Sequence, residues 1–155
     1  MWDTYGGHLL MTFLISTVPV LELRAAIPFG TANGLPLWTA ALVSVLGNIA
    51  PVPFLILFIR RIFTWLRQKS IKWDRLIRRL ELHAAGKGAV VRKYQLLGLF
   101  ILVAIPLPGT GAWTGALVAA MLDIRLRQAF PVIAAGVIAA GGLVSLLTAG
   151  VISLT

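Results

Sequence analysis

One irregular stretch of this chain, Pro106-Leu107-Pro108-Gly109-Thr110-Gly111, largely determines which fold we predict. It lies midway through residues 94–122, which are 29 residues without one Asp, Glu, Lys or Arg. Such a segment exceeds the ~20 apolar residues that cross a bilayer, but proline removes a backbone donor and clashes with the preceding helical turn. Irregular backbone at membrane depth needs protein or water around it, because lipid cannot satisfy its polar groups. The stretch therefore predicts a hairpin turn inside a membrane protein.

Composition places the whole chain in a membrane. Of its 155 residues, 59% are hydrophobic and 12% are charged, whereas about a quarter are charged in soluble domains. A mean hydropathy of +0.92 excludes a soluble nucleic-acid binder despite the net charge of +9. The chain has no cysteine and only two histidines, His8 and His83, so we expect no metal, no cofactor and no enzyme activity. Met1-Trp2-Asp3 lacks the positive start of a signal peptide, which predicts that the whole chain is mature protein.

The basic residues are concentrated in one segment. Eleven of the fourteen Lys and Arg lie in residues 60–93, which the positive-inside rule places in the cytoplasm. Apolar residues recur among them at helical spacing, which predicts an amphipathic interfacial helix broken near Gln68–Ser70. The basic side chains expected at anionic lipid headgroups are Arg61, Arg67, Lys72, Arg75, Arg78 and Arg79. A charged loop that only sets the topology fits the same segment equally well.

Two topologies fit the apolar segments. The first has four transmembrane helices, near residues 8–28, 36–59, 95–121 and 128–152. It places Arg125 and Arg127 on the outer face, against the charge rule. In the second, the first and third segments are re-entrant hairpins, only the other two span the membrane, and both termini lie outside. We expect the second topology because it returns both arginines to the cytoplasm.

The two halves also resemble each other. Residues 26–31 match residues 104–110 with one inserted proline, and in the hairpin topology the halves run in opposite directions. That is an inverted repeat, in which transporters place a site near the midplane with broken helices. We therefore expect an all-α membrane protein of one domain, 1–155. Its two inverted repeats, 1–59 and 94–155, each contain a re-entrant hairpin and one transmembrane helix, and a basic amphipathic cytoplasmic helix in 60–93 joins them.

Glu22 and Arg24 are the candidate chemical groups. They are the only acid and base between Asp3 and Arg60, and ionisable residues inside a membrane are costly enough to suggest a function. An apolar environment favours the protonated carboxyl, which makes Glu22 a candidate proton carrier, whereas the nearby Arg24 opposes that effect. Alternatively, Arg24 lies near a helix end and only sets the topology. The remaining candidate site residues, each of which also has an ordinary packing role, are Pro28, Thr31, Asn48, Pro106, Pro108, Gly109, Thr110, Gly111 and Trp113.

Three motifs together resemble one family. They are Glu22-Leu23-Arg24 within residues 18–28, Gly47-Asn48 followed by Pro51-Val52-Pro53, and the Pro-Leu-Pro-Gly-Thr-Gly turn within 105–115. The chain is similar over nearly its whole length to the small multidrug export protein family of prokaryotic inner-membrane proteins. It is also distantly similar to the DedA (VTT-domain) proteins, which are associated with lipid-carrier translocation and proton coupling. The second turn here has no arginine or acid, so this likeness extends phosphate recognition to Arg24 only.

We therefore expect a multi-pass protein of the prokaryotic inner (plasma) membrane that exports small amphipathic molecules. Its site lies at the midplane between the two hairpin tips, and Glu22 offers proton coupling. Two alternatives stay open: a translocase of lipid or of a polyprenyl phosphate-type lipid carrier, and a scaffold that transports nothing. Two spans and two half-depth hairpins are too few to enclose a path, which predicts a homo-oligomer, most simply a dimer. Anionic lipids are the other expected partners.

Overall fold

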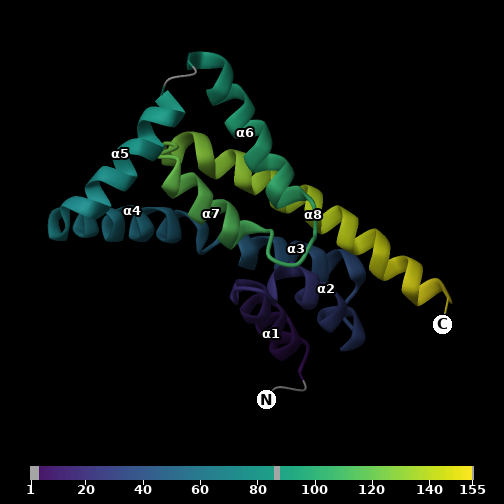
Figure 1. Ribbon diagram of the computed structural model, residues 1–155. Helices are drawn as coiled ribbons and strands as arrows, with labels where there is room; N and C mark the ends of the chain where they lie inside the picture. Colours follow the sequence, from purple (N-terminus) through teal and green to yellow (C-terminus); the bar gives the residue numbers. More distant parts are fainter. Residues whose placement is uncertain (1–3, 86–87, 155) are drawn as a thin grey trace.

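All the regular structure in residues 4–85 and 88–154, which the computed structural model describes apart from the side chains of 77 and 80–92, is α-helical. The helices are α1 (Tyr5–Thr17), α2 (Glu22–Ala32), α3 (Leu37–Ile49), α4 (Val52–Lys69), α5 (Ile71–Ala85), α6 (Gly88–Ala104), α7 (Ala112–Met121) and α8 (Leu126–Leu154). Helices α4, α5 and α6 form three sides of a triangle, and α1 and α2 lie below it in Figure 1.

Two helical rods in the described part of the chain are long and apolar enough to cross a membrane. One is α8, whose 29 residues extend about 43 Å. The other is Leu37–Lys69, in which α3 and α4 follow each other with a break at Ala50–Pro51. Prolines are tolerated at this point because the first helical N–H groups have no intrahelical acceptor. The two predicted spans, 36–59 and 128–152, lie in these rods.

The basic segment differs in part from its prediction. Residues 60–69 continue α4 and do not begin a separate helix, since the apolar stripe of α4 extends through Trp65. The predicted break is confirmed at Ser70, whose extended backbone (φ −150°, ψ 127°) separates α4 from α5. Arg67 is half-buried and the other five predicted headgroup contacts are exposed. Lys69 Nζ lies 4.1 Å from the centre of the Trp65 ring.

The remaining helices form two hairpins. Helices α1 and α2 meet at residues 18–21, and α6 and α7 meet at residues 105–111. None of the four exceeds 17 residues, which is short for a full crossing. The first turn lies earlier than the sequence suggested, because Pro28 is inside α2 and the chain reverses through left-handed backbone at Val20 (φ 76°) and Glu22 (φ 47°).

Helices α2 and α7 end in the same way. The N–H of Leu35 donates to the carbonyl five residues earlier (3.0 Å), and the N–H of Ile124 does likewise (2.9 Å). The preceding residues, Gly34 (φ 86°) and Asp123 (φ 52°), have left-handed backbone. Both ends are therefore Schellman motifs, each with a buried apolar residue after the left-handed one.

The two halves also share a pattern of burial. Each of the eleven buried residues from Glu22 to Val52 has a buried counterpart 89 positions later. This register pairs Glu22 with Gly111. The comparison of short sequence motifs pairs Pro28 with Pro106 instead, but Pro28 lies within α2 and Pro106 lies before α7.

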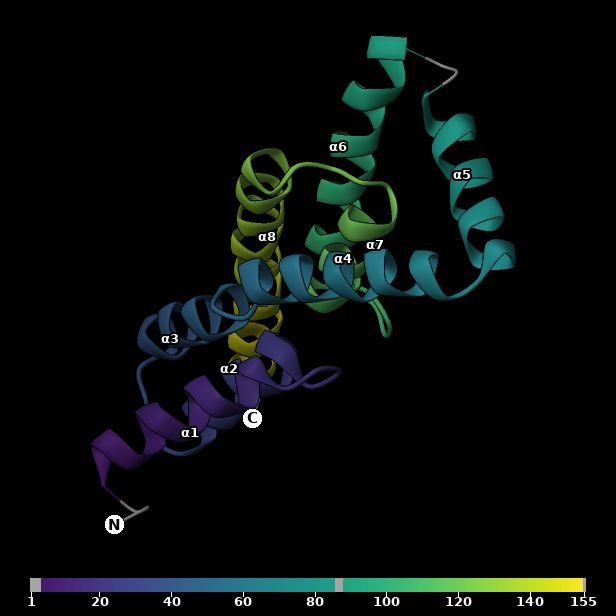
Figure 2. The same cartoon turned by 90° about the vertical axis from the view of Figure 1, so that its left-hand side faces the viewer.

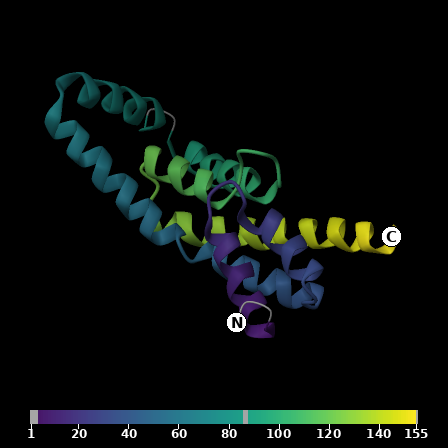
Figure 3. The same ribbon diagram turned by 90° about the horizontal axis from the view of Figure 1, so that it is seen from below.

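Helices of the first half pack against helices of the second half. In Figure 2 the rod of α3 and α4 crosses α8, while α7 packs against α4 and α2 packs against α8. The far ends of α4 and α8 project from opposite sides of the body (Figure 3). Arg60 of α4 donates to the Ile124 carbonyl and lies 3.5 Å from the Asp123 carboxylate. The linker after α7 therefore adjoins the start of the basic segment.

Candidate functional site

Arg24 reaches from the first turn of α2 to the irregular stretch before α7. Its Nη1 donates to the Leu107 carbonyl, and its Nη2 lies 2.6 Å from the Thr110 carbonyl and 2.9 Å from Thr110 Oγ1. Thr110 Oγ1 also accepts the Leu107 N–H (3.1 Å) and lies 2.7 Å from the Ile105 carbonyl. The guanidinium thus donates to two carbonyls of the irregular stretch between α6 and α7.

Glu22 binds the other side of the same turn. Its side chain is 4% exposed, and its Oε1 accepts the N–H of Trp113 at 3.4 Å. The N–H of Ala112 and the side chain of Asn48 also hydrogen-bond the carboxylate. Glu22 therefore provides, from a different helix, the capping oxygen that Gly111 cannot provide at the N-terminus of α7.

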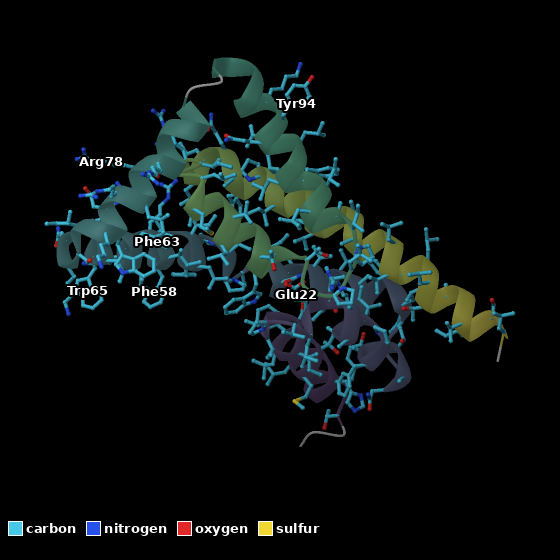
Figure 4. All side chains as sticks on the ribbon, viewed as in Figure 1. Glu22, Phe58, Phe63, Trp65, Arg78 and Tyr94 are labelled. Atoms are coloured by element: carbon cyan, nitrogen blue, oxygen red, sulfur yellow. The ribbon has the colours of Figure 1, made fainter. Side chains whose placement is uncertain are left out.

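Gly111 makes this cap possible. Its φ of 135° is in a region that only glycine adopts readily. A Cβ at this position would overlap the carboxylate of Glu22. Glu22 and Gly111, which are 89 residues apart, are thus in direct contact near the centre of the molecule, where Glu22 is labelled in Figure 4.

Glu22 and Arg24 therefore act on one turn with opposite polarity. The carboxylate accepts N–H groups at the start of α7, and the guanidinium donates to the carbonyls that precede it. Their spacing of two residues directs the side chains to different partners, as expected on a helix.

A cleft of about 520 Å³ opens beside Arg24. One side is α2 with Arg24, Pro28, Thr31 and Ala32, and Pro106 comes from the second turn. The other side is the C-terminal half of α8, lined by Val144, Leu147, Thr148, Val151 and Ile152. The walls are mainly apolar with one cation, which suits an amphipathic molecule.

The predicted site residues lie in several different places. Arg24, Pro28, Thr31 and Pro106 line the cleft, whereas Glu22, Asn48 and Gly111 are buried beside it. Pro108 and Gly109 lie exposed in the turn, and Thr110 holds the Arg24 side chain there. Trp113 donates its indole N–H to the Thr17 carbonyl at 3.1 Å, so its ring ties α7 to α1.

Sequence reasoning did not single out three buried hydroxyls. Thr12 and Ser16 of α1 and Ser44 of α3 are fully buried. Ser44 Oγ and Asn48 Oδ1 have no hydrogen-bond partner within the described part of the chain. A spacing of four residues in the sequence could have indicated them. Thr12 and Ser16 form one such pair and Ser44 and Asn48 form another, and each pair lies on one helix face within an apolar segment. Within residues 4–85 and 88–154, no group of three His, Asp or Glu could hold a metal ion.

The helices and the site define a small all-helical membrane protein with two apolar rods and a charged pair between two turns. The chain belongs to the family described as "Putative small multi-drug export protein", whose pattern matches residues 22–143. The match begins at Glu22, so both charged residues of the site lie within it. No curated protein and no solved structure shows a significant match, and nothing supports the likeness to the DedA proteins.

Proposed function

We propose that this protein exports small amphipathic molecules that carry an anionic group, and that the cleft beside Arg24 is their binding site. The observation that carries this proposal is the position of Arg24 in the wall of a mainly apolar cleft. Sequence reasoning left the substrate charge open, because Glu22 and Arg24 favour opposite signs. In the fold Glu22 is buried against α7 and Arg24 lines the cleft, which favours an anion.

The guanidinium has donors left for a ligand. Among the described contacts, three of its five N–H groups point to the Leu107 and Thr110 acceptors. The remaining Nη1 and Nε hydrogens suit a carboxylate, sulfate or phosphate oxygen. The apolar part of the molecule would lie along Val144, Leu147 and Val151 of α8.

The proposed topology has two re-entrant hairpins, α1–α2 and α6–α7, in two inverted repeats. The short helices support it, as do the opposite directions in which α4 and α8 leave the body. The contact of Arg60 with Asp123 and Ile124 also supports it, because four full crossings would separate these residues by the membrane thickness. Both termini then lie outside the prokaryotic inner membrane, and the exposed basic residues of α4 and α5 face anionic lipid.

Proton coupling through Glu22 follows from its capping role. The negative charge of the carboxylate stabilises the N-terminus of α7, because the helix dipole is positive there. Protonation of Glu22 removes this charge and the stabilisation that it provides. Protonation would therefore loosen the turn that Arg24 also holds, which links a proton to the shape of the cleft.

We infer a homodimer from the exposed apolar faces. Ile138, Leu143, Leu146 and Leu154 of α8 are exposed outside the cleft lining, and two rods alone enclose no path.

The experiment is uptake into proteoliposomes of an anionic amphiphile, a dansylated fatty acid, and of a cationic one, ethidium. Arg24→Gln should reduce uptake of the anion at least tenfold and change uptake of the cation little. Arg61→Gln is the matched control, because it removes an exposed arginine remote from the cleft. Equal uptake by Arg24→Gln and the parent would overturn the proposed site.

The same vesicles test the alternatives. Headgroup-dependent scrambling of fluorescent phosphatidylglycerol would indicate a lipid translocase. Indifference of every probe to both Glu22→Gln and Arg24→Gln would indicate a scaffold.

A further inference from the structure

A row of buried polar side chains leads through the first half of the molecule to Glu22. Its members are Thr12 and Ser16 of α1, Ser44 and Asn48 of α3, and Glu22 itself, none of them more than 4% exposed. They lie in segments that are otherwise apolar. Each buried polar group costs free energy unless it is hydrogen-bonded, so this row needs an explanation.

The contacts give the row its order. Thr12 Oγ1 lies nearest the start of α1 and donates to the His8 carbonyl at 2.7 Å. Ser16, one turn further, donates to the Ser44 carbonyl. Asn48, one turn beyond Ser44, reaches the Glu22 carboxylate. Because α1 and α3 pack together along this line, the row extends from the middle of α1 to the cap of α7.

At the matching positions of the second half, the same packing is made without polar side chains. In the register of 89 residues, Ser44 corresponds to Ile133, Asn48 to Val137, and Glu22 to Gly111. All three counterparts are buried and none carries a polar side chain.

The α1 members have apolar counterparts as well. A Cβ on Gly47 would lie 3.1 Å from the Cβ of Ser16, and one on Gly136 would lie 2.8 Å from the Cβ of Val103. Since Gly47 and Gly136 correspond, Ser16 corresponds to Val103, and one turn earlier Thr12 corresponds to Leu99. Both Val103 and Leu99 are buried core residues.

The fold therefore does not require the polar row, because its other half builds the same packing from Leu, Val, Ile and Gly. Two atoms of the row, Ser44 Oγ and Asn48 Oδ1, are buried and have no partner among the described groups. Such atoms can hydrogen-bond water within the row.

We propose that this row is a hydrated proton relay between the middle of α1 and Glu22. The proposal rests on the proposed export function and names the path by which its proton arrives. A hydronium ion at the outer end gives a proton to the first water or hydroxyl oxygen, and each water or hydroxyl passes on another. The Asn48 amide orients water beside Glu22 and carries no proton itself. The last proton converts the Glu22 carboxylate to the carboxylic acid. The proton then leaves Glu22 toward the inner side, which gives net flux. Each hydroxyl of the row has given one proton and gained one, so the row itself is unchanged.

The surroundings of Glu22 are compatible with a proton as cargo. Asn48 of α3 presents an amide, α7 presents backbone N–H groups, and Arg24 of its own helix presents a positive charge. One carboxylate can hold a single proton, whereas a metal cation would need further oxygen ligands of negative charge.

The first test asks whether water reaches the row. The chain has no native cysteine, so single cysteines report without a background. Ser44→Cys in liposomes should react with a small methanethiosulfonate reagent added outside, at least tenfold faster than Ile133→Cys, its counterpart in the second repeat. Equal, slow reaction at both positions would mean a dry row and would overturn the relay.

The second test measures proton flux with a pH-sensitive dye inside the vesicles. Ser44→Ile and Asn48→Val install the residues of the second repeat and should each slow the flux that depends on Glu22 at least tenfold. The control is Ser145→Ala, which removes a buried unpartnered hydroxyl of α8 outside the row. Thermal unfolding of each variant shows that the fold persists.

The outcomes separate the relay from the export function. Parental proton flux in Ser44→Ile and Asn48→Val would overturn the relay and leave export intact. Absence of any flux that depends on Glu22, with uptake that still depends on Arg24, would also overturn the relay alone. Loss of the Arg24 dependence would instead overturn the proposed function.

Discussion

Replacement of Gly111 by alanine tests how the two turns are joined. A Cβ there would lie 2.6 Å from both Cδ and Oε1 of Glu22, and the backbone has a φ of 135° that L residues avoid. The strained backbone costs about 1–3 kcal/mol. Displacement of the carboxylate removes a charge-assisted hydrogen bond, which costs a further ~1.5–3 kcal/mol. We therefore expect Gly111→Ala to lower the free energy of unfolding by about 2.5–6 kcal/mol.

The assay is unfolding by sodium dodecyl sulfate in mixed micelles, followed by tryptophan fluorescence. Gly142→Ala is the control, because a Cβ there meets nothing within 4 Å and a helical alanine is favoured by ~0.5–1 kcal/mol. In a Glu22→Ala background, Gly111→Ala should cost only the backbone strain, about 1–3 kcal/mol. A Gly111→Ala protein as stable as the parent would show that the carboxylate does not occupy this position, and the capping argument would be wrong.

Three further predictions concern topology, assembly and the Arg60 contact. Cysteine introduced at Asp123 should be labelled only from the cytoplasm and cysteine at Ser153 only from the periplasm, and labelling of position 123 from the periplasm would refute the re-entrant hairpins. The detergent-corrected mass in lipid nanodiscs should be that of two chains, and a mass of one chain would exclude the dimer. Arg60→Ala should destabilise the protein more than Asp123→Ala. The Asp123 side chain is 70% exposed and such ion pairs contribute about 0–1 kcal/mol, whereas Arg60 also binds the Ile124 carbonyl. Equal losses of stability in the two variants would show that the carbonyl contact is unimportant.

The membrane class, the helical fold and the two long rods could be predicted from the sequence. These depend on local properties: the length of apolar runs, the absence of charge and the positions of proline. The break at Ser70 is also local, because it separates two amphipathic stripes. Glu22 and Arg24 stood out for the same reason, as isolated charges in an apolar region.

The partners of those charges were decided only by the tertiary structure. Nothing near Glu22 in the sequence indicates that its carboxylate caps a helix 90 residues later, or that Arg24 holds the carbonyls of the preceding turn. The burial pattern that the two halves share could not be read from the sequence either, because the matching buried positions hold different residue types, such as Ser44 and Ile133. Short motifs report local backbone chemistry, and a contact between distant segments depends on how whole helices pack.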